Sequence, residues 1–408
     1  MDNKKVENNA YAINPFALAE TVAGKSINWD SLEKPEETLS QILNVPIDEI
    51  FDARLPILVP QVELQEDGKA TELTPKAATE RIERFLAKKP QLKFEKELRI
   101  KGLNIESAKQ RISVALVPDG GKADNVASPQ PWYPSGMVWA DKGDYFEDVP
   151  EVSDPIQGGL GDCYFVAALS SVAWSRPYAI ANILRPSSYD NEENPIHRIG
   201  FYDANNKLTY VEVTEHVPVI SGTLDWKYAR SLDAREIWPA VMEKAYAKWR
   251  TAAENDRPNY TIIGTGGDPA VACRALVGGT ISYNYNSQKT TDEIVKFVRS
   301  NCRSKFAFNP MVAWTYSVAP AGCKYDSTTG VVARHAYSIL GWEYANGTTY
   351  VVLRNPWGTY GATIDTLSGT WQPYQTSYYA NVPLNRNGIF AMKASTFKKY
   401  FYACAVVK

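Results

Sequence analysis

The sequence is poor in several features that would each point to a class of protein. It has three histidines and five cysteines, and no two cysteines form a CxxC pair, so zinc-ligand spacing is missing. No apolar run approaches the roughly 18 residues that a membrane-spanning helix needs. Acidic residues number 46 and basic residues 44, so there is no broad positive field for a nucleic-acid backbone. These shortages argue against a zinc-binding, a membrane-spanning or a nucleic-acid-binding protein.

The first twenty residues do not resemble a secretory leader, because no continuous apolar segment is followed by a small-residue cleavage site. A cytoplasmic protein is therefore expected, and secretion stays open if a leader precedes this sequence. The odd cysteine number leaves at least one thiol free in the monomer.

The length of 408 residues allows two or three domains. The first hundred residues are rich in charge, and apolar spacing predicts amphipathic helices over 75–89 and 104–116. A stretch rich in Gly, Pro, Ser and Asn follows, so we place a domain boundary near residue 125. Residues 1–125 are predicted to form an accessory region. Three roles remain open for it: an inhibitory pro-region over the cleft, a targeting or partner-binding module, or a structural brace.

Residues 126–408 have helical patterns first and strand patterns later, which is typical of an α+β fold. The Asn346-Gly347 pair favours a tight hairpin between two strands. A cleft is expected between the helical and the sheet parts. The expected helices cover 163–175 and 234–250, and the expected strands cover 208–213, 336–343, 349–354 and 388–392.

Cys163 is the strongest candidate nucleophile. It follows a glycine-rich turn and begins an apolar, alanine-rich helical segment. A thiol at a helix N-terminus lies beside unsatisfied backbone N–H groups, which favour the thiolate and lower the pKa. Glycines at 158, 159 and 161 would let a substrate backbone approach closely. The amide of Gln157 is placed to stabilise an oxyanion beside the Cys163 N–H.

The other cysteines have no glycine-rich turn before them. A free cysteine is most often a small buried hydrophobic residue, and that interpretation is kept for this group. Its members are Cys273, Cys302, Cys323 and Cys404.

His335 is the favoured imidazole partner, because it stands at the head of an apolar strand. Asn355 follows the next expected strand. If the two strands form a hairpin, the Asn355 amide oxygen can accept the imidazole N–H and fix the ring's tautomer. The alternative for His335 is a satisfied histidine at a strand end. His197 and His216 lie among polar or turn residues and are interpreted as surface or structural.

Three blocks of the sequence resemble, in the same order, the catalytic blocks of the calpain family of papain-like cysteine peptidases. They are QGGLGDCYF at 157–165, RHAYSILGWE at 334–343 and LRNPWG at 353–358. The segments 234–249 and 388–401 are similar to further parts of the calpain core. The resemblance spans about 130–408 and leaves out the N-terminal third.

The resemblance implies a papain-like core of two lobes, one helical and one with an antiparallel sheet. It implies that proteins or peptides are the substrates and that peptide bonds are hydrolysed through an acyl-enzyme. Cys163 would be the nucleophile, His335 the general base and acid, Asn355 its orienting partner and Gln157 the oxyanion donor. No cofactor would be required.

Three residues are assigned to the substrate cleft: Gly161, Trp357 and Arg334. Trp357 resembles the family's tryptophan beside the catalytic groups, and the alternative for it is core packing. Arg334 replaces the family's usual glycine, and its size would narrow the cleft or favour an acidic substrate group. Tyr164 replaces a tryptophan and keeps an amphipathic ring.

Members of the family respond to calcium through acidic residues, and Asp154 matches one of these positions. The other positions match poorly, because Lys207 and Thr359 stand where acids are common. Calcium needs several oxygen ligands, so weak or absent calcium binding is expected.

Two alternatives to a peptidase remain. A Cys-His acyltransferase of the transglutaminase type would use the same nucleophile and base but an Asp as third member, for which Asp365 is available. A catalytically idle binding protein on the same fold usually lacks a catalytic residue, and all four are present here.

Overall fold

The computed structural model describes residues 131–146, 150–183, 185–188, 196–234, 236–373 and 381–408, with short segments and single positions between 19 and 72. The described N-terminal elements are α2 Pro35–Leu43, β1 Val62–Leu64 and β2 Ala70–Glu72. The expected helices over 75–89 and 104–116 lie outside the described residues. The division into 1–125 and 126–408 therefore stays a prediction.

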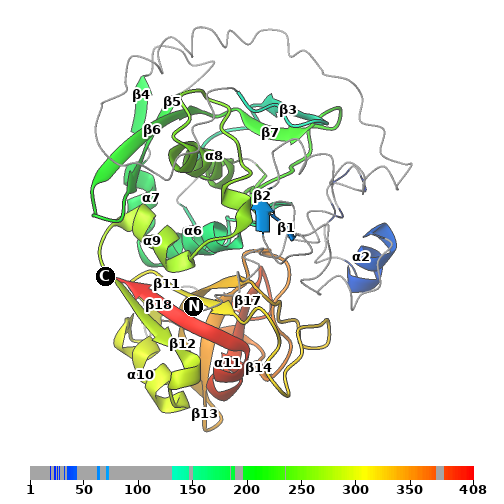
Figure 1. Ribbon diagram of the computed structural model, residues 1–408. Helices are drawn as coiled ribbons and strands as arrows, with labels where there is room; N and C mark the ends of the chain where they lie inside the picture. Colours follow the sequence, from blue (N-terminus) through cyan, green and yellow to red (C-terminus); the bar gives the residue numbers. More distant parts are fainter. Residues whose placement is uncertain are drawn as a thin grey trace, which may run out of the picture.

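A nine-stranded antiparallel sheet forms the lower part of the molecule in Figure 1. Seven strands follow the order β14-β17-β13-β12-β11-β18-β8, and β10 joins β9 to β12. The strands are β8 Ile281–Tyr285, β9 Cys302–Arg303, β10 Phe306–Ala307, β11 Met311–Thr315, β12 Ala336–Ala345, β13 Thr348–Arg354, β14 Thr366–Leu367, β17 Ile389–Lys393 and β18 Phe401–Val407.

The hairpin predicted at Asn346-Gly347 is confirmed. Strand β12 ends at Ala345 and β13 begins at Thr348, and these two residues are paired in the register. Asn346 and Gly347 have φ angles of 51° and 73°. Two consecutive positive φ values match the two-residue turn that follows the right-handed twist of paired strands. The turn fixes which residues of the two strands lie opposite each other.

The upper part of the molecule is rich in helices (Figure 1). Its helices are α6 Cys163–Ser175, α7 Pro177–Ile183, α8 Trp238–Thr251 and α9 Pro269–Val277. Two small antiparallel sheets accompany them, β3 Met137–Ala140 with β7 Val217–Ile220, and β4 Arg185–Ser188 with β5 Ile196–Tyr202 and β6 Leu208–Thr214. The remaining elements are η3 Ile263–Thr265, η4 Asn286–Gln288, α10 Thr291–Ser300, α11 Ala394–Tyr400, and the strand pair β15 Thr370–Trp371 with β16 Val382–Pro383.

The mixture of helix and sheet agrees with the α+β prediction, and α6 has the predicted bounds. The prediction for 234–250 was wrong at its start, because α8 begins at Trp238. Pro239 occupies the first turn, where its missing N–H needs no partner and its fixed φ suits a helix start. The residues before it are used otherwise, since the Ile237 N–H donates to Asp144 O at 2.9 Å.

Helix α6 lies against the large sheet and is hydrogen-bonded to it. The Ser171 hydroxyl donates to Met311 O and accepts from Met311 N–H, both at 2.8 Å. The Ser338 hydroxyl donates to Ala167 O at 2.7 Å. Because hydroxyls provide these contacts in an otherwise apolar interface, the helix has one defined position along β11 and β12.

The sheet separates two apolar cores. Val312 of β11 belongs to the core formed with α6, α8 and α9, whereas Ala313 belongs to the core that α10 and α11 cover. This alternation follows from the two-residue period of a strand. Within the part of the chain that the structure describes, no helix has the length and apolarity needed to cross a bilayer.

Candidate active site

Cys163 is the first residue of α6 and is completely buried. The helix consists almost entirely of apolar and small residues and is buried over most of its length. Asp162 stands at the N-cap, yet its side chain makes no capping hydrogen bond. The nucleophile predicted from the sequence is therefore at the predicted helix terminus, inside the protein.

The predicted lowering of the thiol pKa is contradicted. Burial raises the pKa of Cys163 well above its ordinary value, and the negative charge of Asp162 raises it further. The backbone N–H groups of Ala336 and Tyr164 act in the opposite direction but do not outweigh burial. The helix terminus alone did not decide the ionisation, because desolvation of a buried thiolate is the larger effect. In this closed arrangement the thiol is protonated.

His335 is held immediately before β12 by its backbone. Its N–H donates to the Thr315 hydroxyl at 3.0 Å, and its carbonyl accepts from the Thr315 N–H at 3.0 Å. Arg334, which precedes it, has φ of 51°. This left-handed conformation explains why glycine suits the position and why an arginine there is held at a conformational cost of order 1 kcal/mol. These hydrogen bonds thus fix the backbone position from which the imidazole extends.

The hydrogen bond predicted between His335 and Asn355 is present. His335 Nε2 and Asn355 Oδ1 are 2.8 Å apart, and both side chains are fully buried. Asn355 Oδ1 also accepts the Trp357 N–H at 3.1 Å, which orients the amide with its oxygen toward the ring. An acceptor at Nε2 places the proton there, which leaves Nδ1 of the neutral ring as an acceptor. Among the described residues, Nδ1 has no hydrogen-bond partner.

Burial lowers the pKa of His335 to about 4, although the Asn355 hydrogen bond raises it. Trp357 contributes to this shielding, since its ring centroid is 4.8 Å from that of His335 at an interplanar angle of 47°. Trp357 is also buried, so it covers the imidazole and packs in the core at once. The two interpretations of this tryptophan were not exclusive.

The structure brings Cys163 and the His335 segment together. Helix α6 packs on β12, and the thiol lies close enough to the Ala336 N–H for that group to favour the thiolate. No hydrogen bond joins Cys163 Sγ to the His335 ring in the described arrangement. Cys163 and the His335 segment therefore lie at the same interface between α6 and β12, and the thiol and the imidazole do not form an ion pair there.

Gln157 is fully buried near the start of α6. Its backbone N–H donates to Pro356 O at 2.8 Å, which attaches it to the turn that carries Asn355 and Trp357. Its side-chain Nε2 donates to Leu160 O at 2.6 Å. One amide hydrogen is therefore engaged within the glycine-rich turn, and the predicted oxyanion contact needs the other one.

The role predicted for Gly158 was wrong. A Cβ there would lie 2.2 Å from the carbonyl oxygen of Tyr228, so the glycine is needed for a close backbone approach inside the protein. The Gly159 N–H donates to Lys227 O at 2.8 Å as part of the same contact. Gly161 is buried like the rest of the turn. In this structure the turn meets the 227–230 segment and not open solvent.

Asp154 does not have the surroundings of a calcium ligand. Its carboxylate accepts the Glu151 N–H at 2.6 Å and the Trp238 indole N–H at 3.2 Å. Burial raises its pKa to about 7. Donors directed at an oxygen compete with a cation for it, and no group of three or more His, Cys, Asp or Glu gathers here or elsewhere in the described residues. The two N–H donors agree with the expectation of weak or absent calcium binding, which stays a prediction.

Arg354 is a site residue that the sequence interpretation missed. It is fully buried, and its guanidinium donates to Pro155 O at 2.8 Å, Ser153 O at 2.7 Å and the Ser170 hydroxyl at 2.6 Å. Burial lowers its pKa to about 9. Arg354 thus ties the end of β13 to α6 and to the segment before Gln157. Its position directly before Asn355 was the available signal.

The remaining residues singled out from the sequence lie elsewhere. His197 was expected at the surface or in a structural role, and it is buried with Nε2 2.8 Å from Glu215 Oε1. Cys273 and Cys404 are buried as expected, and Cys302 and Cys323 are half-buried. Asp365 accepts from the Thr396 hydroxyl at 2.6 Å. The residue that hydrogen-bonds the imidazole is therefore Asn355. Asp365 lies directly before β14 and accepts a hydrogen bond from α11 instead.

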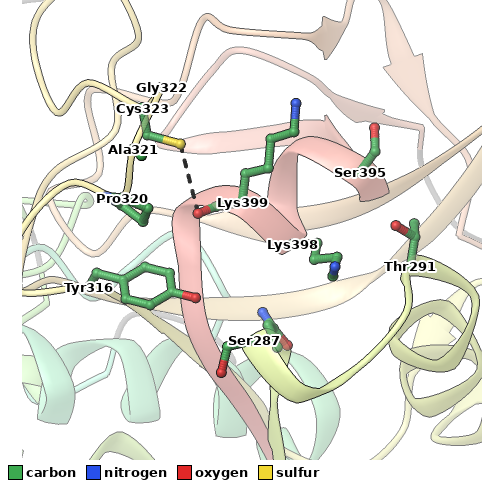
Figure 2. Close-up of a pocket in the computed structure, with 11 residues that line it drawn as sticks. Ser287, Thr291, Tyr316, Pro320, Ala321, Gly322, Cys323, Ser395, Lys398 and Lys399 are labelled. Carbon is green, nitrogen blue, oxygen red and sulfur yellow. Dashed lines mark hydrogen bonds between the residues drawn. The ribbon is translucent and has the colours of Figure 1, made fainter.

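A separate pocket of about 500 Å³ lies between α11 and the loop after β11. Figure 2 shows the residues that line it. None of the predicted catalytic or cleft residues lines it. Its lining residues include Tyr316, Cys323, Ser395, Lys398 and Lys399. The catalytic candidates lie in a closed interface and this pocket lies on another part of the surface.

Comparisons with known proteins bear on this arrangement. A family model described as calpain family cysteine protease matches residues 119–408. A thiol protease of Porphyromonas gingivalis is 29% identical over 272 residues, covering 61% of this chain and 53% of that protein. The calpain-2 catalytic subunit of Gallus gallus is 26% identical over 210 residues, covering 50% of this chain and 28% of the subunit. The chain thus spans about half the length of the first relative and less of the second.

Proposed function

Because the chain belongs to the calpain family of cysteine proteases, we propose that it is a cysteine endopeptidase that hydrolyses peptide bonds of proteins. The papain-like arrangement of a helical lobe and a sheet lobe with a substrate cleft between them is part of the proposal. The family match and the names of the relatives support a cysteine protease. Which proteins are cleaved is a further matter that the relatives' names do not address.

The observation that carries the proposal is the 2.8 Å hydrogen bond between His335 Nε2 and Asn355 Oδ1. It supports an imidazole whose other nitrogen, Nδ1, is an acceptor without a partner in the described residues. Cys163 lies on the facing helix against the residue after His335. A thiol, an imidazole and an orienting amide in this order are the parts that thiol acyl transfer requires.

In the proposed mechanism, His335 Nδ1 accepts the Cys163 proton as sulfur attacks the carbonyl carbon and the C–S bond forms. The Cys163 N–H and the Gln157 amide stabilise the oxyanion. The tetrahedral intermediate collapses, the C–N bond breaks, and His335 gives its proton to the leaving amine. Water then attacks the thioester, and His335 takes a proton from it. The C–S bond breaks, His335 gives that proton to sulfur, and the acid leaves with the thiol regenerated.

This mechanism requires the closed interface to open. Cys163, His335, Asn355 and Gln157 are all fully buried, so a peptide cannot reach sulfur in the described arrangement. Contact with water and substrate lowers the pKa of the thiol and raises that of the imidazole, since burial caused both shifts. Opening therefore activates the pair, and the closed state keeps it neutral.

The alternatives receive less support. A transglutaminase-type acyltransferase would need an acidic third member, and Asn355 occupies that position. An idle binding protein would need no such oriented imidazole. The proposal also holds that calcium is not required, which the donors on Asp154 support. Inhibition by residues 1–125 and a cytoplasmic location are proposed on the sequence alone.

Covalent labelling tests the proposed nucleophile. A peptide carrying a thiol-reactive chloromethyl ketone is expected to modify Cys163 faster in the native chain than in the chain unfolded in urea, and peptide mass mapping locates the adduct. Only a thiol activated by its surroundings gains reactivity on folding. Cys273→Ala serves as the control and is expected to label normally. Native labelling of Cys163 that is slower than in urea would contradict the proposal.

A further inference from the structure

Two buried carboxyl groups meet directly behind the candidate nucleophile. Asp162 is the residue before Cys163, and Glu243 belongs to α8. Asp162 is 0% exposed and Glu243 is 1% exposed. Their side chains lie near enough to each other that each carboxyl acts on the ionisation of the other. Acidic side chains are almost never fully buried without a partner, so this pair needs an explanation.

The hydrogen-bond donors around the pair are too few for two carboxylates. The Ala229 N–H donates to both oxygens of Glu243, at 3.2 and 3.1 Å. Neither side-chain oxygen of Asp162 accepts a hydrogen bond of good geometry, although the Gln157 amide and the Asp162 backbone N–H lie near enough to favour its charged form. Two ionised carboxylates are acceptors only, so a hydrogen bond between them requires one proton. A hydrogen bond between Asp162 and Glu243 therefore requires that the two carboxyls share a proton.

No positive charge compensates the pair. Among the described residues, no ion pair involves Asp162 or Glu243, and neither is acted on by a lysine or an arginine. The groups that face them are the Gln157 amide, the Tyr164, Tyr228 and Tyr260 rings, and the Cys163 thiol. Burial raises the pKa of both carboxyls, and each negative charge disfavours the other.

The pair joins three segments of the site. Glu243 holds Ala229, and the neighbouring residues of that segment pair with the glycine-rich turn. Ile156 and Arg230 exchange backbone hydrogen bonds of 2.9 and 3.0 Å, and the Gly159 N–H donates to Lys227 O at 2.8 Å. Asp162 ends that turn and begins α6. A change at the pair therefore reaches the segment that carries Gln157 at one end and the Cys163 thiol at the other.

We propose that Asp162 and Glu243 share one proton and act as a positioning pair, which fixes the turn from Gln157 to Cys163 for catalysis and releases it when the shared proton is lost at alkaline pH. This inference rests on the peptidase function proposed above. The second ionisation also places more negative charge beside the thiol, and the charge of Asp162 raises the pKa of Cys163. Both consequences lower the activity as the pH rises.

Substitutions of Glu243 separate positioning from bulk stability. Glu243→Ala removes the hydrogen bond, and kcat for casein is expected to fall about 10- to 100-fold with KM changed less than about threefold. Glu243→Gln replaces the shared proton with an amide hydrogen that can donate to Asp162 at any pH. It is expected to restore most of kcat at pH 7 and to move the alkaline loss of activity to higher pH. Glu236→Gln, at another buried glutamate, is the matched control and is expected to leave the profile unchanged.

Infrared difference spectra test the proton without any reference to activity. With Asp154 replaced by Asn, because a pKa of about 7 would leave that carboxyl partly protonated, the chain at pH 7 is expected to show the carbonyl band of a buried protonated carboxyl. The band is expected to be missing when Glu243→Gln is added and present when Glu236→Gln is added. If Glu243→Ala does not fold, the Gln variant and the spectra decide. A missing band in the Asp154→Asn chain would contradict the shared proton. Activity profiles of wild type and Glu243→Gln that coincide at alkaline pH would contradict it too. Casein left uncut by every variant while the band is present would instead overturn the peptidase function.

Discussion

The side-chain oxygen of Asn355 lies 2.8 Å from Nε2 of His335, although twenty positions separate the two residues. The hairpin of β12 and β13 brings them together, because His335 precedes the first strand and Asn355 follows the second. The backbone of Asn355 is fixed separately by its N–H, which donates to Gly388 O at 2.9 Å. The orientation of the imidazole thus depends on a sheet that is ordered before any substrate arrives.

Asn355→Ala should lower kcat for casein by about 10²-fold, because the ring loses the acceptor that sets its tautomer. The measurement is steady-state hydrolysis at pH 7. Asn309→Ala is the control, since Asn309 accepts from Arg176 at 2.7 Å and does not contact His335. Equal activities for the two variants would mean that His335 is not oriented by Asn355.

Arg354→Met should destabilise the protein by about 3 kcal/mol or more. Its loss leaves four acceptors, Pro155 O, Ser153 O, Asn387 O and the Ser170 hydroxyl, without their donor. Arg354→Lys should recover part of this loss, because an ammonium reaches fewer of the four acceptors. Urea unfolding measures both, with exposed Arg303→Met as the control. A decrease of less than about 0.5 kcal/mol in the free energy of unfolding of Arg354→Met would show that these hydrogen bonds contribute little to stability.

Acid should destabilise the folded chain through His335. Burial lowers its folded pKa to about 4 from an ordinary value of 6.5, so the unfolded chain binds the proton more tightly. The contribution is fully present above pH 6.5 and is lost as the pH falls from 6.5 to 4, by up to roughly 3 kcal/mol. Asp154, whose pKa is raised to about 7, has the opposite slope, so wild type must be compared with His335→Gln.

The comparison uses urea unfolding at pH 7 and pH 4.5. The wild type should lose more stability between these values than His335→Gln does, because only the wild type has the buried imidazole. Equal losses in the two proteins would contradict the buried, neutral state of His335.

Calcium should not change the activity of the wild-type chain. Asp154 accepts two N–H groups and has no companion cluster of acids in the described residues. Casein hydrolysis is measured with calcium and with a chelator, and calcium binding by titration calorimetry. Activity that disappears with the chelator and returns with calcium would contradict this prediction.

The parts of the fold that the sequence predicted are those set by local chemistry. The Asn346-Gly347 turn specifies its hairpin because both residues tolerate positive φ, and the apolar run after Cys163 specifies a buried helix. The start of α8 was missed by four residues. The apolar pattern extends back to 234, and the Ile237 N–H is used by Asp144, which is distant in the sequence.

The properties that the sequence could not predict depend on tertiary burial. The helix terminus at Cys163 favours a thiolate, but the depth of burial reverses the shift. The sequence suggested that Gly158 leaves room for a substrate backbone. In the folded chain the backbone of Tyr228 takes up that room. In the sequence Arg354 is an ordinary charged residue at the end of a strand, and only the folded chain places four acceptors around it.

Casein hydrolysis by the wild-type chain, by Cys163→Ala and by Cys302→Ala decides whether Cys163 is the nucleophile. Cys302 is half-buried in β9, away from the candidate catalytic residues. Its replacement therefore controls for the loss of a thiol. We expect cleavage by the wild type and by Cys302→Ala, and none by Cys163→Ala. Cleavage that persists in Cys163→Ala at the wild-type rate would contradict the role of Cys163 as the nucleophile.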